Sequence, residues 1–137
     1  MLMRKSEAEK RNCTILAEIT AHASHAQKPA EFTLAPIGAM ERVLAKTGWS
    51  KDDVDLFEIN EAFAVVTLAA MKDMGIPHAK VNVIGGACAL GHPIGASGAR
   101  ILVTLINAMI KRDVTKGIAS LCIGGGEAVA VAVTRSV

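Results

Sequence analysis

Three residues that can do chemistry stand at the ends of apolar stretches that predict buried strands. Asn60 follows the stretch 54–59, His92 lies in the loop after 81–84, and Cys122 closes the stretch that begins at residue 117. Ligands of α/β sheets bind at the carboxyl ends of the strands, so we expect this amide, imidazole and thiol to meet at one sheet edge. A neutral imidazole can take a proton from a thiol near pH 7, because their usual pKa values are about 6.5 and 8.5. A thiol can itself act as a base once a neighbour lowers its pKa. These capacities suit acyl chemistry on a thioester.

Each of the three residues also has a purely structural interpretation. Asn60 fits the N-cap of the helix that follows it, since asparagine is a favoured capping residue. Cys122 fits an inert buried thiol, because free cysteine is among the most buried residue types. His92 fits a tight turn in which its ring caps a neighbouring carbonyl. The residues taken singly leave these alternatives open.

Two glycine-rich stretches flank the candidate residues. The loop from Gly85 to Arg100 holds five glycines, and Pro93 follows His92 directly. Glycine permits positive φ and proline fixes φ, so this loop has a specified shape. The N–H groups of residues 124–126 can point at a developing oxyanion, and loss of one such donor costs about 10²–10³ in rate. Neither stretch continues as a nucleotide-binding motif, because no Gly-Lys-Ser/Thr follows and the second opens a strand.

The cysteines and the composition bound the class of protein. Cys13, Cys88 and Cys122 form no Cys-x-x-Cys pair, which indicates reduced thiols and a cytoplasmic location. A zinc site from Cys88, His92 and Cys122 is conceivable, but it lacks a fourth ligand and paired spacing, so no metal is predicted. The chain of 137 residues is 51% hydrophobic and 20% charged, which suits one globular domain.

Other partners are disfavoured by charge and hydropathy patterning. A net charge of +2 without a stripe of basic and aromatic residues gives no support for nucleic-acid binding. No apolar run reaches the 18 residues that a membrane span needs, and the basic N-terminus lacks the apolar stretch of a secretory signal.

Strand and helix signals alternate along the chain. Expected strands cover 14–24, 54–59, 81–84, 117–123 and 128–134, and expected helices cover 6–11, 36–47, 61–74 and 97–112. The first helix would begin with a Ser6-x-x-Glu9 capping box and end at Asn12. The order β-α-β-α-β-α-β-β predicts an α/β fold, with a five-stranded mixed sheet, helices on its faces and a closing antiparallel hairpin. The helix at 97–112 is apolar almost all round, so we expect it to pack on something beyond the sheet as well.

Three stretches together resemble the C-terminal signatures of the thiolases. They are Asn60 to Ala64, Gly85 to Arg100 and Cys122 to Gly126, in the family's order and spacing. The likeness runs from about residue 3 to residue 133, and implies the thiolase C-terminal fold. It also implies acyl transfer by reversible Claisen condensation of two acyl-CoA molecules, as in acetyl-CoA C-acetyltransferases, with thiolysis of 3-ketoacyl-CoA as the reverse.

The resemblance implies roles for individual residues. His92 would activate the nucleophile and bind the thioester oxygen, and Asn60 would hold a water in the same oxyanion site. Cys122 would move the proton on the α-carbon, and the Gly124 N–H would help to form a second oxyanion hole. The acyl pocket would be lined by three residues, Phe63, Ala62 and Phe32. Coenzyme A thioesters would be substrates, and no cofactor is expected.

One departure from the family concerns the nucleophile. Thiolases carry the acylated cysteine in the N-terminal half, and neither Cys13 nor Cys88 stands in such a motif. Residues 13–137 would therefore be the C-terminal domain, and residues 1–12 would be the end of a preceding half. The chain alone would be inactive. An N-terminal thiolase half or a partner subunit would have to complete the active site. The full enzyme would be a homo-oligomer. The alternative is a non-catalytic module that binds acyl-CoA or another subunit.

Overall fold

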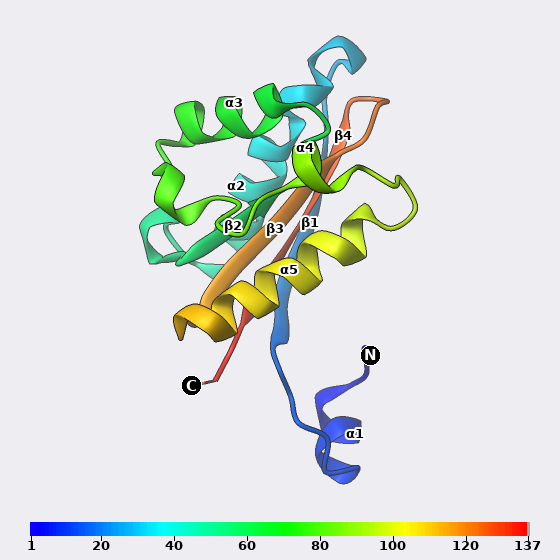
Figure 1. The fold of residues 1–137 in the computed structure, drawn as a ribbon, viewed down its shortest axis with the longest axis vertical. Helices are drawn as coiled ribbons and strands as arrows, with labels where there is room; N and C mark the ends of the chain where they lie inside the picture. The colour runs from blue at the N-terminus through cyan, green and yellow to red at the C-terminus, as the bar shows by residue number, and fades with distance from the viewer. Residues whose placement is uncertain (137) are drawn as a thin grey trace.

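A mixed sheet of four strands forms the centre of the computed structural model, which describes residues 1–136 (Figure 1). Across the sheet the order is β1-β4-β3-β2. The inner strands pair antiparallel, as β1 does with β4, whereas β2 and β3 are parallel. The strands are β1 (Glu18–Ala26), β2 (Leu56–Ile59), β3 (Lys116–Cys122) and β4 (Glu127–Thr134). The predicted α/β class and closing hairpin are thereby confirmed.

The expected fifth strand at 81–84 is wrong, and Asn82 supplies the reason. Val81 forms a single parallel bridge with Phe57 of β2. At Asn82 the backbone turns left-handed, with φ of 47°, and leaves the sheet. The Asn82 side-chain amide then pairs with β2 in place of a backbone, accepting from Ile59 N–H at 2.8 Å and donating to Ile59 C=O at 2.8 Å. One side chain thus ends the pairing after one residue.

Helices cover both faces of the sheet (Figure 1). On one face lie α2 (Ala35–Thr47) and α3 (Ala64–Met74), and α5 (Ser97–Arg112) lies on the other. The first helix, α1, stands apart from the sheet in Figure 1. The short elements are α1 (Lys5–Lys10), η1 (Pro29–Leu34), η2 (Lys51–Asp53), η3 (His78–Lys80) and α4 (Ala87–Leu90).

Two helices end at a glycine as expected, but two predicted N-caps are wrong. Gly48 and Gly75 are left-handed and end α2 and α3. Ser6 lies inside α1 and makes no cap, since this helix begins after Arg4. Asn60 is not the N-cap of α3 either. That helix begins three residues later than predicted, with Phe63 at its N-cap, because Asn60 points at other partners.

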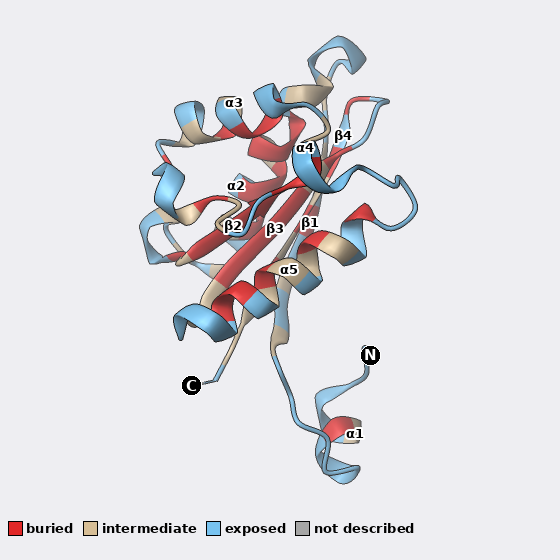
Figure 2. Ribbon diagram, in the orientation of Figure 1, coloured by how far each residue is buried: buried red, intermediate tan, exposed pale blue. Residues whose placement is uncertain are grey.

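The sheet separates two apolar cores. Much of β2 and β3 is coloured as buried in Figure 2. The larger core lies beneath α2 and α3, and contains Met40, Phe57 and Ile118. In the smaller core, Ile101 and Leu105 of α5 pack on the sheet.

The outer face of α5 still carries apolar side chains. Val103 is 59% exposed and Ile110 is 39% exposed, so the sheet covers only one side of this helix. Among residues 1–136, no helix is long and apolar enough to cross a membrane.

Candidate active site

Asn60 and His92 meet at the carboxyl end of β2. The Asn60 N–H donates to Ser120 C=O of β3 at 2.9 Å, so strand pairing fixes the backbone just beyond Ile59. The Asn60 side chain is fully buried, and its Nδ2 lies 3.5 Å from His92 Nε2. The loop leaves His92 itself exposed. The predicted approach of these two residues is thus present.

A serine at the start of α5 holds the opposite side of the His92 ring. Ser97 Oγ lies 2.6 Å from His92 Nδ1, and the Ser97 hydroxyl donates to Pro93 C=O at 3.1 Å. Ser97 is 1% exposed. The imidazole is therefore held at both nitrogens, by Asn60 and by Ser97.

A partly buried ion pair, Arg100 with Glu58, stands behind Asn60. Arg100, one turn along α5, donates from Nη2 to Asn60 Oδ1 at 3.3 Å. Its Nη1 lies 3.5 Å from Glu58 Oε2. Glu58 is 1% exposed, and burial raises its pKa to about 7, which the positive charge of Arg100 only partly offsets.

Glu61 fixes the loop that leads to His92. One carboxylate oxygen accepts from the Cys88 N–H at 2.9 Å, and the other accepts from the Asn82 amide at 3.0 Å. Burial acts to raise the pKa of Glu61, but these hydrogen bonds hold it below its usual range. Gly86 passes so close to this carboxylate that a Cβ there would collide with it. The loop is thereby tied to the end of β2.

Cys122 ends β3, the strand next to β2, and so reaches the same edge of the sheet. It is 7% exposed and packs in the larger core, on the side of α2 and α3. Within residues 1–136, no hydrogen bond joins it to Asn60 or His92. Burial raises the pKa of its thiol, so no neighbour described here supplies the lowering that a resting base needs. That Cys122 shares a cavity with the other two residues stays a prediction.

Gly124 is exposed in the turn between β3 and β4. The turn is closed by Ile123 N–H donating to Glu127 C=O at 2.7 Å and by Gly126 N–H donating to Ile123 C=O at 3.1 Å. Its role in an oxyanion hole stays a prediction.

The two phenylalanines expected in an acyl pocket lie together. The Phe32 and Phe63 rings meet edge to face, with centroids 6.4 Å apart. Phe63 is 61% exposed, whereas Phe32 and Ala62 are partly buried against the larger core. Among residues 1–136, no group of three or more His, Cys, Asp or Glu side chains is placed to hold a metal ion.

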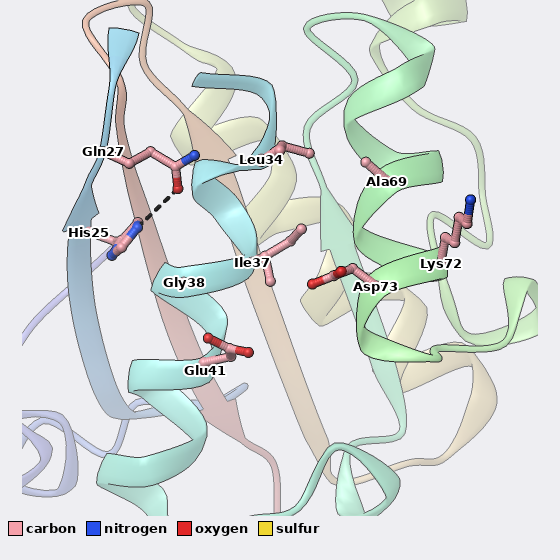
Figure 3. Close-up of a pocket in the computed structure, with 9 residues that line it drawn as sticks. All are labelled: His25, Gln27, Leu34, Ile37, Gly38, Glu41, Ala69, Lys72 and Asp73. Atoms are coloured by element: carbon pink, nitrogen blue, oxygen red, sulfur yellow. Dashed lines mark hydrogen bonds between the residues drawn. The ribbon is translucent and has the colours of Figure 1, made fainter. Parts of the chain in front are cut away.

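A groove of about 640 Å³ opens between α2 and α3 (Figure 3). His25 lies at one end, with Nε2 3.0 Å from Gln27 Oε1. None of the predicted site residues lines this groove, so it is separate from the site around His92. Its lining is His25, Gln27, Leu34, Ile37, Gly38, Glu41, Ala69, Lys72 and Asp73.

Three residues that support the site, Ser97, Asn82 and Glu58, have no predicted role in the sequence. A carboxylate inside the apolar strand Leu56–Ile59 was the available signal for Glu58. Ser97 and Asn82 act through contacts with residues 5 and 23 positions away, which no local pattern shows.

The chain matches the family model described as "Thiolase, C-terminal domain" over residues 13–135. The chain belongs to the thiolase family. The Mus musculus protein named cytosolic acetyl-CoA acetyltransferase is 51% identical over 135 residues, which are 98% of this chain and 34% of that protein. The chain therefore spans about a third of the length of the thiolases it matches.

Solved thiolase structures share this fold closely. The acetyl-CoA acetyltransferase of Bacillus anthracis superposes with a TM-score of 0.95 at 42% identity, covering 98% of this chain and 34% of that one. Human mitochondrial 3-ketoacyl-CoA thiolase, solved in complex with CoA, gives 0.94 at 38% identity, covering 97% and 34%.

Proposed function

We propose that this thiolase domain supplies the acid–base and oxyanion groups for reversible Claisen condensation of two acyl-CoA molecules. The observation that carries the proposal is the contact between a fully buried amide and an exposed imidazole held at both nitrogens. His92 takes the proton from the acyl-accepting thiol, and Asn60 holds a water beside it. The imidazole and that water donate to the thioester oxygen as negative charge develops there.

The remaining steps fall to the end of β3. Cys122 moves the proton on the α-carbon, and the Gly124 N–H donates to the second oxyanion. The raised pKa of Cys122 keeps it neutral at rest. For Cys122 to act as a base, a dipole or positive charge from outside this chain would have to lower the pKa of its thiol.

The nucleophile lies on a segment outside these 137 residues. Cys13 is exposed and follows α1, and no hydrogen bond among the described residues joins it to the site. Cys88 is exposed near it, but the hydrogen bond between its thiol and Glu61 raises its pKa, which opposes thiolate formation. An N-terminal thiolase half or a partner subunit would complete the site, within a homo-oligomer.

Acyl-CoA is the substrate, with no cofactor required. The acyl pocket would be lined by Phe32, Phe63 and Ala62. The Phe63 ring is exposed in this chain, so an acyl group could pack against it. We further infer that residues 1–12 end a preceding half and that the protein acts in the cytoplasm.

Reconstitution tests this function. The pure chain should turn over no acetoacetyl-CoA, and thiolysis should appear when it is mixed with the N-terminal two-thirds of a thiolase relative. His92→Gln should abolish the restored activity, whereas the matched change His78→Gln, on η3, should preserve it. Thiolysis by the pure chain that disappears on Cys88→Ser would instead make Cys88 the nucleophile.

The second candidate is a non-catalytic module that binds acyl-CoA or another subunit. Several large apolar side chains around the site favour it, including Leu90 at 65% and Ile94 at 87% exposure. Such a module would bind coenzyme A in calorimetry without a partner, or assemble with a subunit. His92→Ala would leave either function intact, which separates this candidate from the catalytic one.

A further inference from the structure

The buried carboxylate of Glu58 has no role in building the sheet. Its neighbours along β2 are apolar and buried, and an apolar residue at this position would avoid the cost of burying a charge. One oxygen, Oε2, faces Arg100 at 3.5 Å. The other, Oε1, is buried and has no hydrogen-bond partner among the described residues. A group kept under such conditions calls for an explanation beyond the fold.

Arg100 connects Glu58 to the candidate active site. Its two terminal nitrogens point at different residues, Nη1 at Glu58 and Nη2 at Asn60 Oδ1. A guanidinium can only donate hydrogen bonds, so the Asn60 atom that faces it must be the amide oxygen. The Asn60 NH₂ group is thereby turned toward His92.

The orientation of the amide decides which nitrogen of His92 carries the proton. An NH₂ group facing Nε2 makes that nitrogen the acceptor, so the proton of the neutral ring sits on Nδ1. Nδ1–H then donates to Ser97 Oγ at 2.6 Å, and the Ser97 hydroxyl donates its own hydrogen bond to Pro93 C=O at 3.1 Å. Every donor in this series of hydrogen bonds meets an acceptor, and the lone pair on Nε2 accepts from the Asn60 amide.

We propose that Glu58 and Arg100 are positioning residues that set the tautomer of His92 by fixing the amide of Asn60. Glu58 holds the guanidinium, the guanidinium orients the amide, and the amide selects Nε2 as the basic nitrogen. Both residues act on His92 through Asn60. The catalytic meaning of this arrangement rests on the proposed function, but the tautomer is a property of the chain itself.

The test is the tautomer of His92, measured by long-range ¹H–¹⁵N correlation in the ¹⁵N-histidine-labelled chain. Spectra are recorded at pH 8.5, above the usual histidine pKa of about 6.5. The chain has four histidines, and the spectrum of His92→Gln identifies the signals of His92. One hydrogen bond of ordinary strength favours one tautomer about fivefold. We therefore expect Arg100→Met to lower the ratio of Nδ1–H to Nε2–H by about that factor.

Arg135→Met is the matched control. Arg135 is also paired with a carboxylate, Asp113 at 3.1 Å, and its side chain is 17% exposed against 20% for Arg100. It lies after β4, at the other end of β3 from Cys122, and its loss should leave the His92 signals unchanged.

Two further variants keep the test decisive if Arg100→Met does not fold. Glu58→Leu removes the oxygen that accepts from Arg100, so it should lower the ratio of Nδ1–H to Nε2–H. Glu58→Gln keeps an acceptor oxygen, so its ratio should stay close to that of the unmodified chain. An unchanged ratio in folded Arg100→Met, or in Glu58→Leu where the former does not fold, would overturn the proposal.

Activity gives a separate readout. In the reconstituted enzyme, Arg100→Met should lower kcat by up to about fivefold, in line with the smaller population of the active tautomer, and should leave KM little changed. If the unmodified reconstituted enzyme is inactive, the proposed function fails. The tautomer measurement then still decides the positioning roles of Glu58 and Arg100.

Discussion

Replacing Glu58 by Gln should raise the stability of the chain at neutral and alkaline pH. The pKa of Glu58 is about 7 in the folded chain against 4.5 for the ordinary carboxyl, so the folded state keeps a proton that the unfolded state releases between these values. The contribution of this group to stability is therefore fully present below pH 4.5 and is lost as the pH rises through about 7. Arg100 and Glu61 are the charged groups that act on it.

The size of the effect follows from the same two values. Each tenfold change in an ionisation constant corresponds to about 1.4 kcal/mol, so ionising Glu58 in place costs the fold about 3 kcal/mol. Gln has nearly the same shape and never ionises. The free energy of unfolding of Glu58→Gln should thus resemble that of the unmodified chain at pH 4.5 and exceed it by about 2–3 kcal/mol at pH 8.

Urea unfolding followed by the fluorescence of Trp49, the single tryptophan, measures this difference at pH 4.5, 6, 7 and 8. Glu61→Gln is the control of opposite sign, because hydrogen bonds hold the pKa of Glu61 below its usual range. That variant should be less stable than the unmodified chain at pH 7, and the deficit should shrink as the pH falls. Parallel stability curves for Glu58→Gln and the unmodified chain from pH 4.5 to 8 would contradict a raised pKa of Glu58 in the folded chain.

Three further substitutions probe the packing around the site. Gly117→Ala places a Cβ 2.7 Å from Met109 Sδ, so overpacking should lower the free energy of unfolding by about 1–3 kcal/mol in urea titration. Gly86→Ala should displace the Glu61 carboxylate and speed hydrogen exchange at the Cys88 amide, at a cost of about 1–2 kcal/mol. For both, Gly95→Ala, which meets nothing within 4 Å, should change neither stability nor exchange. Cys122→Ser buries a hydroxyl and should cost about 1–3 kcal/mol in thermal or urea unfolding, whereas exposed Cys13→Ser should change stability by less than about 0.5 kcal/mol. Equal losses at the two cysteines would contradict the burial of Cys122.

Short-range sequence signals predicted much of the fold. Pro36, Gly48 and Gly75 mark the ends of α2 and α3, because their backbone preferences act within a turn. Asn60 does follow the end of β2, as the rule for α/β sheets predicts, but His92 reaches it from a loop and not from a strand end.

The wrong predictions involve polar side chains that form hydrogen bonds with residues far away in the sequence. Asn60 looks like a helix cap locally, but its amide is held between His92 and Arg100, so α3 begins later. Residues 81–84 look like a strand, but the amide of Asn82 replaces the backbone in pairing with Ile59. Such bonds depend on which elements become neighbours, and no pattern within either segment reveals them.

Asn82 also decides how the sheet meets its surroundings at the β2 edge. An unpaired strand offers a row of N–H and C=O groups on which another chain can add, and this is a common route to aggregation. Here the Phe57 C=O accepts from the Asn82 N–H at 2.9 Å, and both polar groups of Ile59 are occupied by the Asn82 side chain. A single asparagine therefore stops the sheet from growing outward, and it does so directly beside the residues that hold His92.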